Sequence, residues 1–152
     1  MLIVLVGMPA SGKSTLGQEI ARKLNFKFID LDHLICAREQ CDIPEIFRTQ
    51  GESYFRQAER NALISVLSLT DLVLATGGGT PCFFDNMDLI NQSALSLFLE
   101  TPIATIAERI RADRDNIRPL YAQKSHQELI DYLDELYKKR QFFYQKAHLT
   151  LK

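Results

Sequence analysis

Residues 2–14 read LIVLVGMPASGKS, and this stretch decides the fold. Leu2 to Val6 is a continuous apolar run, partly β-branched, that is stopped by Gly7. An unbroken apolar run of this length is typical of a strand buried on both faces of a parallel sheet. We therefore expect the chain to open with an interior strand that leads directly into a loop.

A helix is predicted to start at Lys13, where this loop ends. Asn25 closes the segment, and asparagine is a residue that often ends helices. The apolar residues between them recur at i, i+4 and i+8, the spacing of one buried helical face, and are Leu16, Ile20 and Leu24. The opening is thus predicted to be strand, loop and helix.

The loop from Gly7 to Ser14 has the pattern G-x-x-x-x-G-K-S. Small residues let several backbone N–H groups turn inward around phosphate oxygens at a helix N-terminus, where the helix dipole also favours anions. Lys13 is then expected on the β- and γ-phosphates of a nucleoside triphosphate, and Ser14 on Mg²⁺. A chance match in a surface turn is the alternative, but the flanking strand and helix are the context that the pattern needs. The predicted nucleotide contacts here are Gly7, Ala10, Ser11, Gly12, Lys13, Ser14 and Thr15.

The rest of the chain alternates between strand and helix patterns. Helices are predicted over 52–68, 103–110 and 125–146, with a further one that has Pro44 in its first turn. Further strands are predicted over 26–30, 71–76, 94–100 and 148–151. This alternation predicts an α/β fold of three layers, in which a five-stranded parallel sheet lies between helices on both faces.

Composition limits the possible partners. The 152 residues, of which 46% are apolar, fit one compact domain over residues 1–152. Lys and Arg number 18 against 19 Asp and Glu, a net charge of -1 that favours neither nucleic acid nor a membrane surface as partner. The apolar run after Met1 is too short for a signal peptide or membrane span, so a cytoplasmic location is expected. Cys36, Cys41 and Cys82 lack the spacing of a disulfide framework or zinc site.

A second group of polar and glycine residues follows the predicted strands. Asp30 and Asp32 come just after the second strand, and residues 77–79, all glycine, follow the third, at the sheet edge where ligands of α/β folds bind. Arg56 and Glu59 are one helical turn apart. Taken singly, these features also fit a helix cap, a plain turn and a surface ion pair. The arginine-rich stretch from residue 109 to 118 likewise fits a solvated, salt-bridged surface.

In order along the chain, the blocks GMPASGKST, FIDLD, IPEIF-RTQGESYFRQAE, ATGGGTP, RADRDNIRPLY and RQFFYQKA resemble the shikimate kinase family. The resemblance covers essentially residues 1 to 151. It implies a fold like that of nucleoside-monophosphate kinases, with strand order 2-3-1-4-5 and usually a monomer. It also implies ATP-dependent phosphorylation of the 3-hydroxyl of shikimate with Mg²⁺, a step in the biosynthesis of aromatic amino acids.

The resemblance also implies roles for individual residues. Asp32 matches the aspartate that holds the reacting hydroxyl and accepts its proton, and Asp30 the one that supports Mg²⁺ through water. It places the substrate region at about 31–60 and a lid over the phosphates at about 109–123. Lys13, Asp32 and Arg118 are expected to be catalytic, Arg111 to stack on adenine, and Arg118 to swing over the phosphates as the lid arginine. The substrate set is Asp32, Arg56, Gly77, Gly78, Gly79 and Arg140, with the two arginines on the carboxylate and Glu59 orienting Arg56.

Some positions depart from the family pattern. The lid reads RPLY instead of RPLL, and Phe142 and Phe143 stand where a proline is frequent. Two alternatives remain open at this point. One is another small P-loop kinase, acting on gluconate or a nucleoside monophosphate, and the other is a nucleotide-binding module without catalysis. The acid pair and the two separated arginines suit a small polyhydroxy carboxylate better than a base. The presence of the predicted catalytic and binding residues argues against the non-catalytic module, and these residues are Lys13, Ser14, Asp32, Arg56, Arg118 and Arg140.

Overall fold

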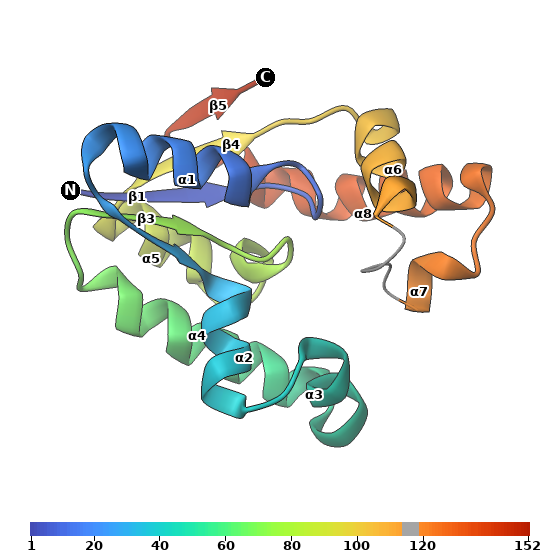
Figure 1. Cartoon of the computed structure of the whole chain (residues 1–152), viewed down its shortest axis with the longest axis horizontal. Helices are drawn as coiled ribbons and strands as arrows, with labels where there is room; N and C mark the ends of the chain where they lie inside the picture. Colours follow the sequence, from blue (N-terminus) through green and yellow to red (C-terminus); the bar gives the residue numbers. More distant parts are fainter. Residues whose placement is uncertain (114–118) are drawn as a thin grey trace.

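The computed structural model describes residues 1–113 and 119–152. At its centre lies a five-stranded sheet in the order β2-β3-β1-β4-β5, in which every pairing is parallel. The strands are β1 (Leu2–Val6), β2 (Lys27–Asp30), β3 (Leu72–Ala75), β4 (Leu95–Leu99) and β5 (Leu149–Leu151), seen in Figure 1. The predicted α/β class and strand order are therefore confirmed.

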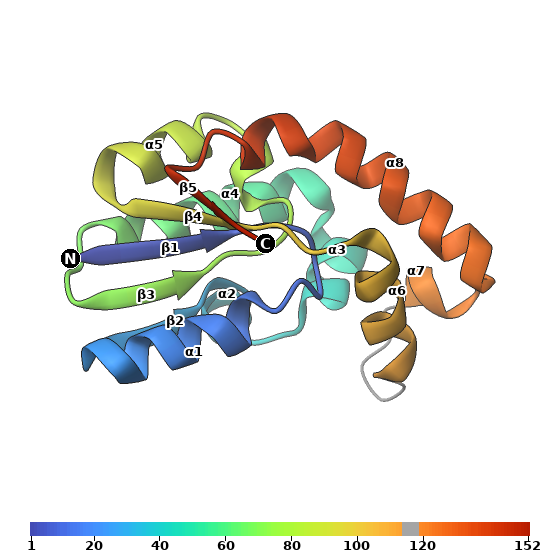
Figure 2. The ribbon, with the colours of Figure 1, turned by 90° about the horizontal axis from the view of Figure 1, so that it is seen from above.

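Helices cover both faces of this sheet (Figures 1 and 2). Alternate residues of β1 reach opposite layers: Ile3 and Leu5 pack with Ala21, whereas Val4 and Val6 join the larger cluster, which also contains Leu63 and Leu133. The helices are α1 (Lys13–Leu24), α2 (Leu31–Glu39), α3 (Ile43–Gln50), α4 (Glu52–Leu67), α5 (Asn86–Ser93), α6 (Ile103–Ala112), α7 (Pro119–Ala122) and α8 (His126–Tyr144), with a 3₁₀ turn η1 at Thr80–Cys82. The three-layer arrangement follows from this two-sided burial of the central strand.

The prediction for the buried face of α1 was right only in part, since Ile20 packs against the core but Leu24 does not. Leu24 is 46% exposed, and the residues of α1 that are buried are Lys13, Gly17 and Ala21. A Cβ added at Gly17 would lie 2.6 Å from Cε2 of Phe28 in β2. The helix therefore approaches the sheet through its small residues, and the larger apolar side chains lie beside that contact line.

Three helices were not predicted, namely α2, α5 and α7. The start of α2 is fixed by Asp30, whose carboxylate accepts a hydrogen bond from the backbone N–H of His33. Asp30 is thus an N-cap, which is the structural role that the sequence left open for the acidic pair after the second strand. Pro44 lies in the first turn of α3 as predicted. The boundaries of the other predicted elements differ from the observed ones by one or two residues.

No helix in residues 1–113 and 119–152 is long and apolar enough to cross a membrane.

The helix α8 starts with a capping box, in which Ser125 and Glu128 each bond the backbone of the other. These reciprocal bonds satisfy two backbone donors that a helix start leaves without partners. They fix the start of the helix that carries Arg140 toward the site.

Candidate active site

Two adjoining cavities lie at the carboxyl ends of the strands. The larger, of about 850 Å³, is bordered by the loop from Pro9 to Thr15 and by Thr101 to Thr105. The smaller, of about 110 Å³, is bordered by residues of α3, α4, α7 and α8. Four residues line both cavities, and they are Pro9, Asp32, Gly77 and Gly78. The arrangement is one large chamber joined to a smaller one through these four residues.

The loop between β1 and α1 uses backbone conformations that its small residues allow. Gly7 has φ 150°, Ala10 φ 58° and Gly12 φ 98°, and Gly12 is the N-cap of α1. A Cβ at Gly7 would lie 2.7 Å from the backbone oxygen of Leu99, so glycine is required there by both space and φ. Ala10 takes up its left-handed conformation with a side chain that is exposed.

Lys13 is buried within this loop. Its ammonium donates hydrogen bonds to the carbonyl oxygens of Gly7 at 2.9 Å and Met8 at 2.7 Å. A buried ammonium at the N-terminus of α1 places a positive charge where the helix dipole is also positive, which is the electrostatic setting for a phosphate group. Of the predicted loop residues, Ala10 to Thr15 line the larger cavity and Gly7 does not. Their contacts with a nucleotide stay a prediction.

Ser14 and Asp30 meet beside the loop. The Ser14 hydroxyl donates a hydrogen bond to Oδ2 of Asp30 over 2.7 Å. Residues 1–113 and 119–152 contain no group of three or more His, Cys, Asp and Glu that could hold a metal ion alone. Mg²⁺ commonly takes one or two protein oxygens together with phosphate oxygens and water, and the Ser14–Asp30 pair fits that donor set.

Each glycine of residues 77–79 lies against one functional side chain. The contacts are close enough that a Cβ would collide with the side chain in each case. Such a Cβ would lie 2.9 Å from Asp32 Oδ1 at Gly77, 2.9 Å from Arg140 Nη1 at Gly78, and 2.7 Å from Arg56 Nη1 at Gly79. The turn after β3 therefore gathers one carboxylate and two guanidinium groups that are far apart in the sequence.

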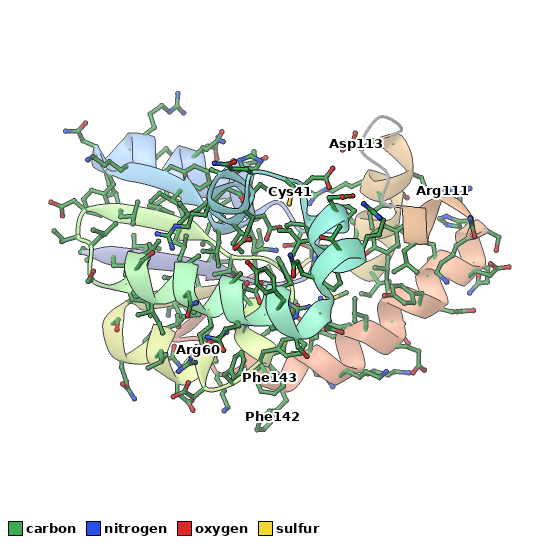
Figure 3. The ribbon with its side chains drawn as sticks, turned by 90° about the horizontal axis from the view of Figure 1, so that it is seen from below. Cys41, Arg60, Arg111, Asp113, Phe142 and Phe143 are labelled. Carbon is green, nitrogen blue, oxygen red and sulfur yellow. The ribbon has the colours of Figure 1, made fainter. Side chains whose placement is uncertain are left out.

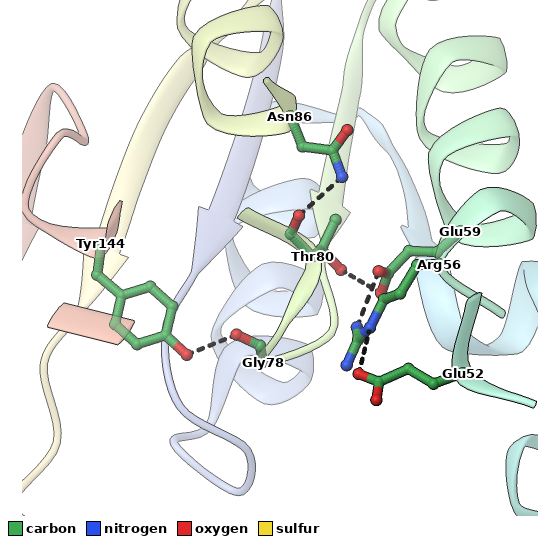
Figure 4. A network of polar contacts seen from close by, with 7 residues as sticks. All are labelled: Glu52, Arg56, Glu59, Gly78, Thr80, Asn86 and Tyr144. Atoms are coloured by element: carbon green, nitrogen blue, oxygen red, sulfur yellow. Dashed lines mark hydrogen bonds and ion pairs between the residues drawn. The ribbon is translucent and has the colours of Figure 1, made fainter. Parts of the chain in front are cut away.

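Arg56 is held in the smaller cavity by several groups (Figure 4). Its guanidinium donates to Glu59 at 3.0 Å and, more weakly, to the exposed Glu52 at 3.4 Å. The Phe83 ring lies beneath it, 4.0 Å from the guanidinium carbon to the ring centroid. A planar donor fork held in this way is preorganised for a carboxylate.

Glu59 is buried to 1% exposure and supports Arg56 from below. Burial raises the pKa of its carboxyl above the usual range, and the nearby Arg56 and the hydrogen bond from Thr80 act against that rise. The Thr80 hydroxyl donates to Glu59 at 2.8 Å, and the Asn86 amide donates to the Thr80 carbonyl at 2.8 Å (Figure 4). Thr80 and Asn86 were not among the predicted residues, although Thr80 follows the glycine run directly.

The predicted arginines of residues 109–118 have different positions. Arg109 lines the larger cavity and donates to the Ala10 carbonyl at 3.3 Å. Arg111 is exposed near the end of α6 (Figure 3) and lines neither cavity. Arg118, expected as the lid arginine, lies outside the described residues. The expected adenine contact of Arg111 thus remains a prediction, and Arg109 is an additional cation at the loop.

The two phenylalanines that depart from the family pattern lie near the end of α8 (Figure 3). Phe142 is 65% exposed, and the Lys146 ammonium lies 5.0 Å from its ring centroid. Neither Phe142 nor Phe143 lines a described cavity. Within the described residues, this departure leaves the linings of both chambers unaltered.

The fold and the two chambers define a P-loop protein of the small-molecule kinase type, with a phosphate-binding loop beside an acid and two arginines. The family described as "SKI: Shikimate kinase" matches residues 9–152. The chain therefore belongs to the shikimate kinase family.

Individual relatives agree with this assignment. The chain is 43% identical over 145 residues to a shikimate kinase of Phocaeicola vulgatus, covering 95% of this chain and 82% of the relative. A crystal structure of shikimate kinase from Bacteroides thetaiotaomicron superposes with a TM-score of 0.96 at 38% identity, covering 100% and 86% of the two chains. A structure from Acinetobacter baumannii, described as a shikimate kinase in complex with shikimate, gives a TM-score of 0.89 at 36% identity, covering 99% and 82%.

Proposed function

We propose that this protein transfers the γ-phosphate of ATP to the 3-hydroxyl of shikimate, giving shikimate 3-phosphate and ADP. The observation that carries the proposal is the turn of residues 77–79, which holds Asp32, Arg140 and Arg56 each within contact distance of one glycine. This turn lies beside the phosphate-binding loop, since Pro9 and Gly78 line both chambers. An acceptor in the smaller chamber would thus meet the end of a triphosphate in the larger one.

The acceptor end of the reaction is assigned to three side chains. Arg56 and Arg140 bind the carboxylate of the substrate, because a guanidinium offers two parallel donors to two oxygens. Asp32, at the junction of the chambers, holds the attacking hydroxyl and takes its proton as the new O–P bond forms. This division orients the acceptor from its carboxylate end and activates it from the other.

The donor end is assigned to the loop. Backbone N–H groups of Gly7 and of residues 10–15 cradle the phosphates, and Lys13 exchanges its loop carbonyl partners for β- and γ-phosphate oxygens. Arg118 and Arg111 remain proposed contacts of the phosphates and the adenine. Ser14 and, through water, Asp30 would hold Mg²⁺, which would neutralise charge on the phosphates. We further propose that the chain acts as a monomer in the cytoplasm.

A coupled assay of ADP release tests the proposal. The protein is incubated with ATP and Mg²⁺, alone and with shikimate, gluconate or each nucleoside monophosphate. We expect ADP release to rise only with shikimate, and phosphorus NMR to show the phosphate on the 3-hydroxyl. Stimulation by gluconate or a nucleoside monophosphate instead would assign the chain to the rival kinases. ATP binding without turnover on any acceptor would favour the non-catalytic module.

A further inference from the structure

Tyr144 is the last residue of α8 and contacts Gly78, which lines both chambers. It is fully buried, and its ring stacks on Phe98 of β4 with 5.2 Å between ring centroids. It follows Arg140 by four residues, so helical geometry places both side chains on the same face of α8. The proposed function gives Arg140 a role but assigns none to Tyr144.

The Tyr144 hydroxyl contacts the binding machinery on three sides. It donates a hydrogen bond to the carbonyl oxygen of Gly78 (Figure 4), and the Arg140 side chain lies near enough to act on the pKa of the phenol. On the third side, Met8 Sδ in the phosphate-binding loop lies 3.8 Å away. One hydroxyl thus bonds the acceptor turn, borders the donor loop and lies near an arginine of the clamp.

The bond to Gly78 constrains the glycine turn itself. The peptide unit is planar and trans, so fixing the direction of the Gly78 carbonyl also fixes the Gly79 N–H, which points the opposite way. Glycine has the widest backbone freedom, and three in a row hold a defined geometry only if outside contacts restrain them. Tyr144 supplies such a restraint from a rigid helix.

We propose that Tyr144 is a positioning residue for the acceptor site, which sets the orientation of the Gly78–Gly79 peptide. The inference rests on the proposed function, because it names the acceptor chamber as the part that Tyr144 supports. The Tyr144 hydroxyl acts on only one of the two sites. Its loss loosens the acceptor contacts and leaves the triphosphate contacts of the loop in place.

The protonation of Tyr144 is consistent with this role. Burial raises the pKa of the phenol above its ordinary value, although the neighbouring Arg140 opposes the rise. The hydroxyl therefore keeps its proton and remains a donor to Gly78 throughout the neutral and mildly alkaline range. The hydrogen bond from Tyr144 to Gly78 therefore does not depend on pH in this range.

The variant Tyr144→Phe removes the hydroxyl and keeps the ring that packs on Phe98. We expect the KM for shikimate to rise on the order of tenfold, while the KM for ATP stays within about twofold. Calorimetric titration with shikimate alone should show the same loss. If the two KM values changed together, or if neither changed, the variant would have lost only stability. Either result would overturn the proposal.

Val66→Ala provides the matched control. Val66 is buried in α4 and lines neither cavity, so this change reduces stability without touching the turn. We expect its KM values for both substrates to remain near those of the wild type once the two variants are compared at equal fractions folded. A shift in the shikimate KM as large as that of Tyr144→Phe would also overturn the proposal.

A second measurement does not depend on turnover. In ¹⁵N-labelled protein without substrate, the Gly79 amide of Tyr144→Phe should change its chemical shift and exchange faster with solvent, whereas the Gly17 amide should not change. An unaltered Gly79 amide refutes the positioning role even if the protein phosphorylates shikimate. An altered Gly79 amide supports the positioning role even if the wild-type protein does not phosphorylate shikimate. The positioning role and the proposed function can therefore fail separately.

Discussion

The Ser14 hydroxyl donates a hydrogen bond to Oδ2 of Asp30 over 2.7 Å, joining the first turn of α1 to the end of β2. Asp30 uses its other carboxylate oxygen to cap α2. The carboxylate is therefore fixed in direction by the helix and turned toward the hydroxyl. This pair is the protein's contribution to the proposed Mg²⁺ site.

Ser14→Ala removes the hydroxyl from this pair. The Mg²⁺ concentration for half-maximal activity should rise on the order of tenfold, because one proposed oxygen ligand is lost. The measurement is a titration of activity with Mg²⁺ at saturating ATP and shikimate. Ser65→Ala, which removes a hydroxyl from α4 that bonds the Ala62 carbonyl, is the control. An unchanged Mg²⁺ requirement would show that Ser14 is not a ligand.

Asp32→Asn keeps the size of the side chain at the junction of the chambers and removes its charge. Turnover should fall on the order of a hundredfold or more, with ATP affinity nearly unchanged, because the general base for the acceptor hydroxyl is lost. Steady-state kinetics and nucleotide titration together measure both quantities. Asp131→Asn, on an exposed part of α8, should have no such effect. Weakened ATP binding with normal turnover would refute the assignment.

Gly79→Ala tests the contact between the glycine turn and Arg56. Gly79 has φ -91°, so alanine is tolerated by the backbone, but its Cβ would lie 2.7 Å from the end of the Arg56 side chain. The guanidinium must move, and the KM for shikimate should rise on the order of tenfold with little loss of stability. Kinetics and a thermal melt measure the two effects.

Gly17→Ala is the opposite case and serves as its control. The new Cβ would meet the Phe28 ring at 2.6 Å and Leu5 at 3.1 Å inside the core. Overpacking should cost about 1–3 kcal/mol of unfolding free energy, while the shikimate KM of the folded fraction stays unchanged. If Gly79→Ala behaved like Gly17→Ala, the turn would have a packing role only.

Glu59→Gln tests the buried acid beneath Arg56. Burial raises the folded-state pKa of Glu59 above the value of 4.5 expected in the unfolded chain. Between these two pKa values the folded state holds the extra proton, so this group's contribution to stability is complete below pH 4.5 and falls as the pH rises. The slope is at most about 1.4 kcal/mol per pH unit. Glutamine does not titrate, so the Glu59→Gln variant lacks this pH-dependent contribution to stability.

Urea unfolding of the wild type and Glu59→Gln at a series of pH values measures this contribution. The difference in unfolding free energy, wild type minus variant, should decrease as the pH rises from 4.5 through the folded-state pKa. An increase over the same range would mean that Arg56 outweighs burial and lowers the pKa of Glu59. A difference that is independent of pH would mean that the two effects cancel.

Much of the fold followed from local patterns. The apolar run of β1, the loop of residues 7–14 and the alternation of later segments predicted the parallel sheet with helices on both faces, because burial on two faces leaves no polar positions in a central strand. The helix α2 was not predicted, since it begins directly at the end of β2 without an intervening turn. The predicted buried face of α1 was right for Ile20 and wrong for Leu24, because the helix approaches the sheet most closely at Gly17.

The sequence by itself determined the chemistry available: a phosphate-binding loop, a carboxylate pair, a glycine run and arginines in a recognisable order. These follow from residue type and local spacing. Only the tertiary structure decided which of them meet, because residues 32, 56 and 140 become neighbours through the packing of α2, α4 and α8 around one turn. The same packing, and no local spacing, brings the Tyr144 hydroxyl to the carbonyl of Gly78.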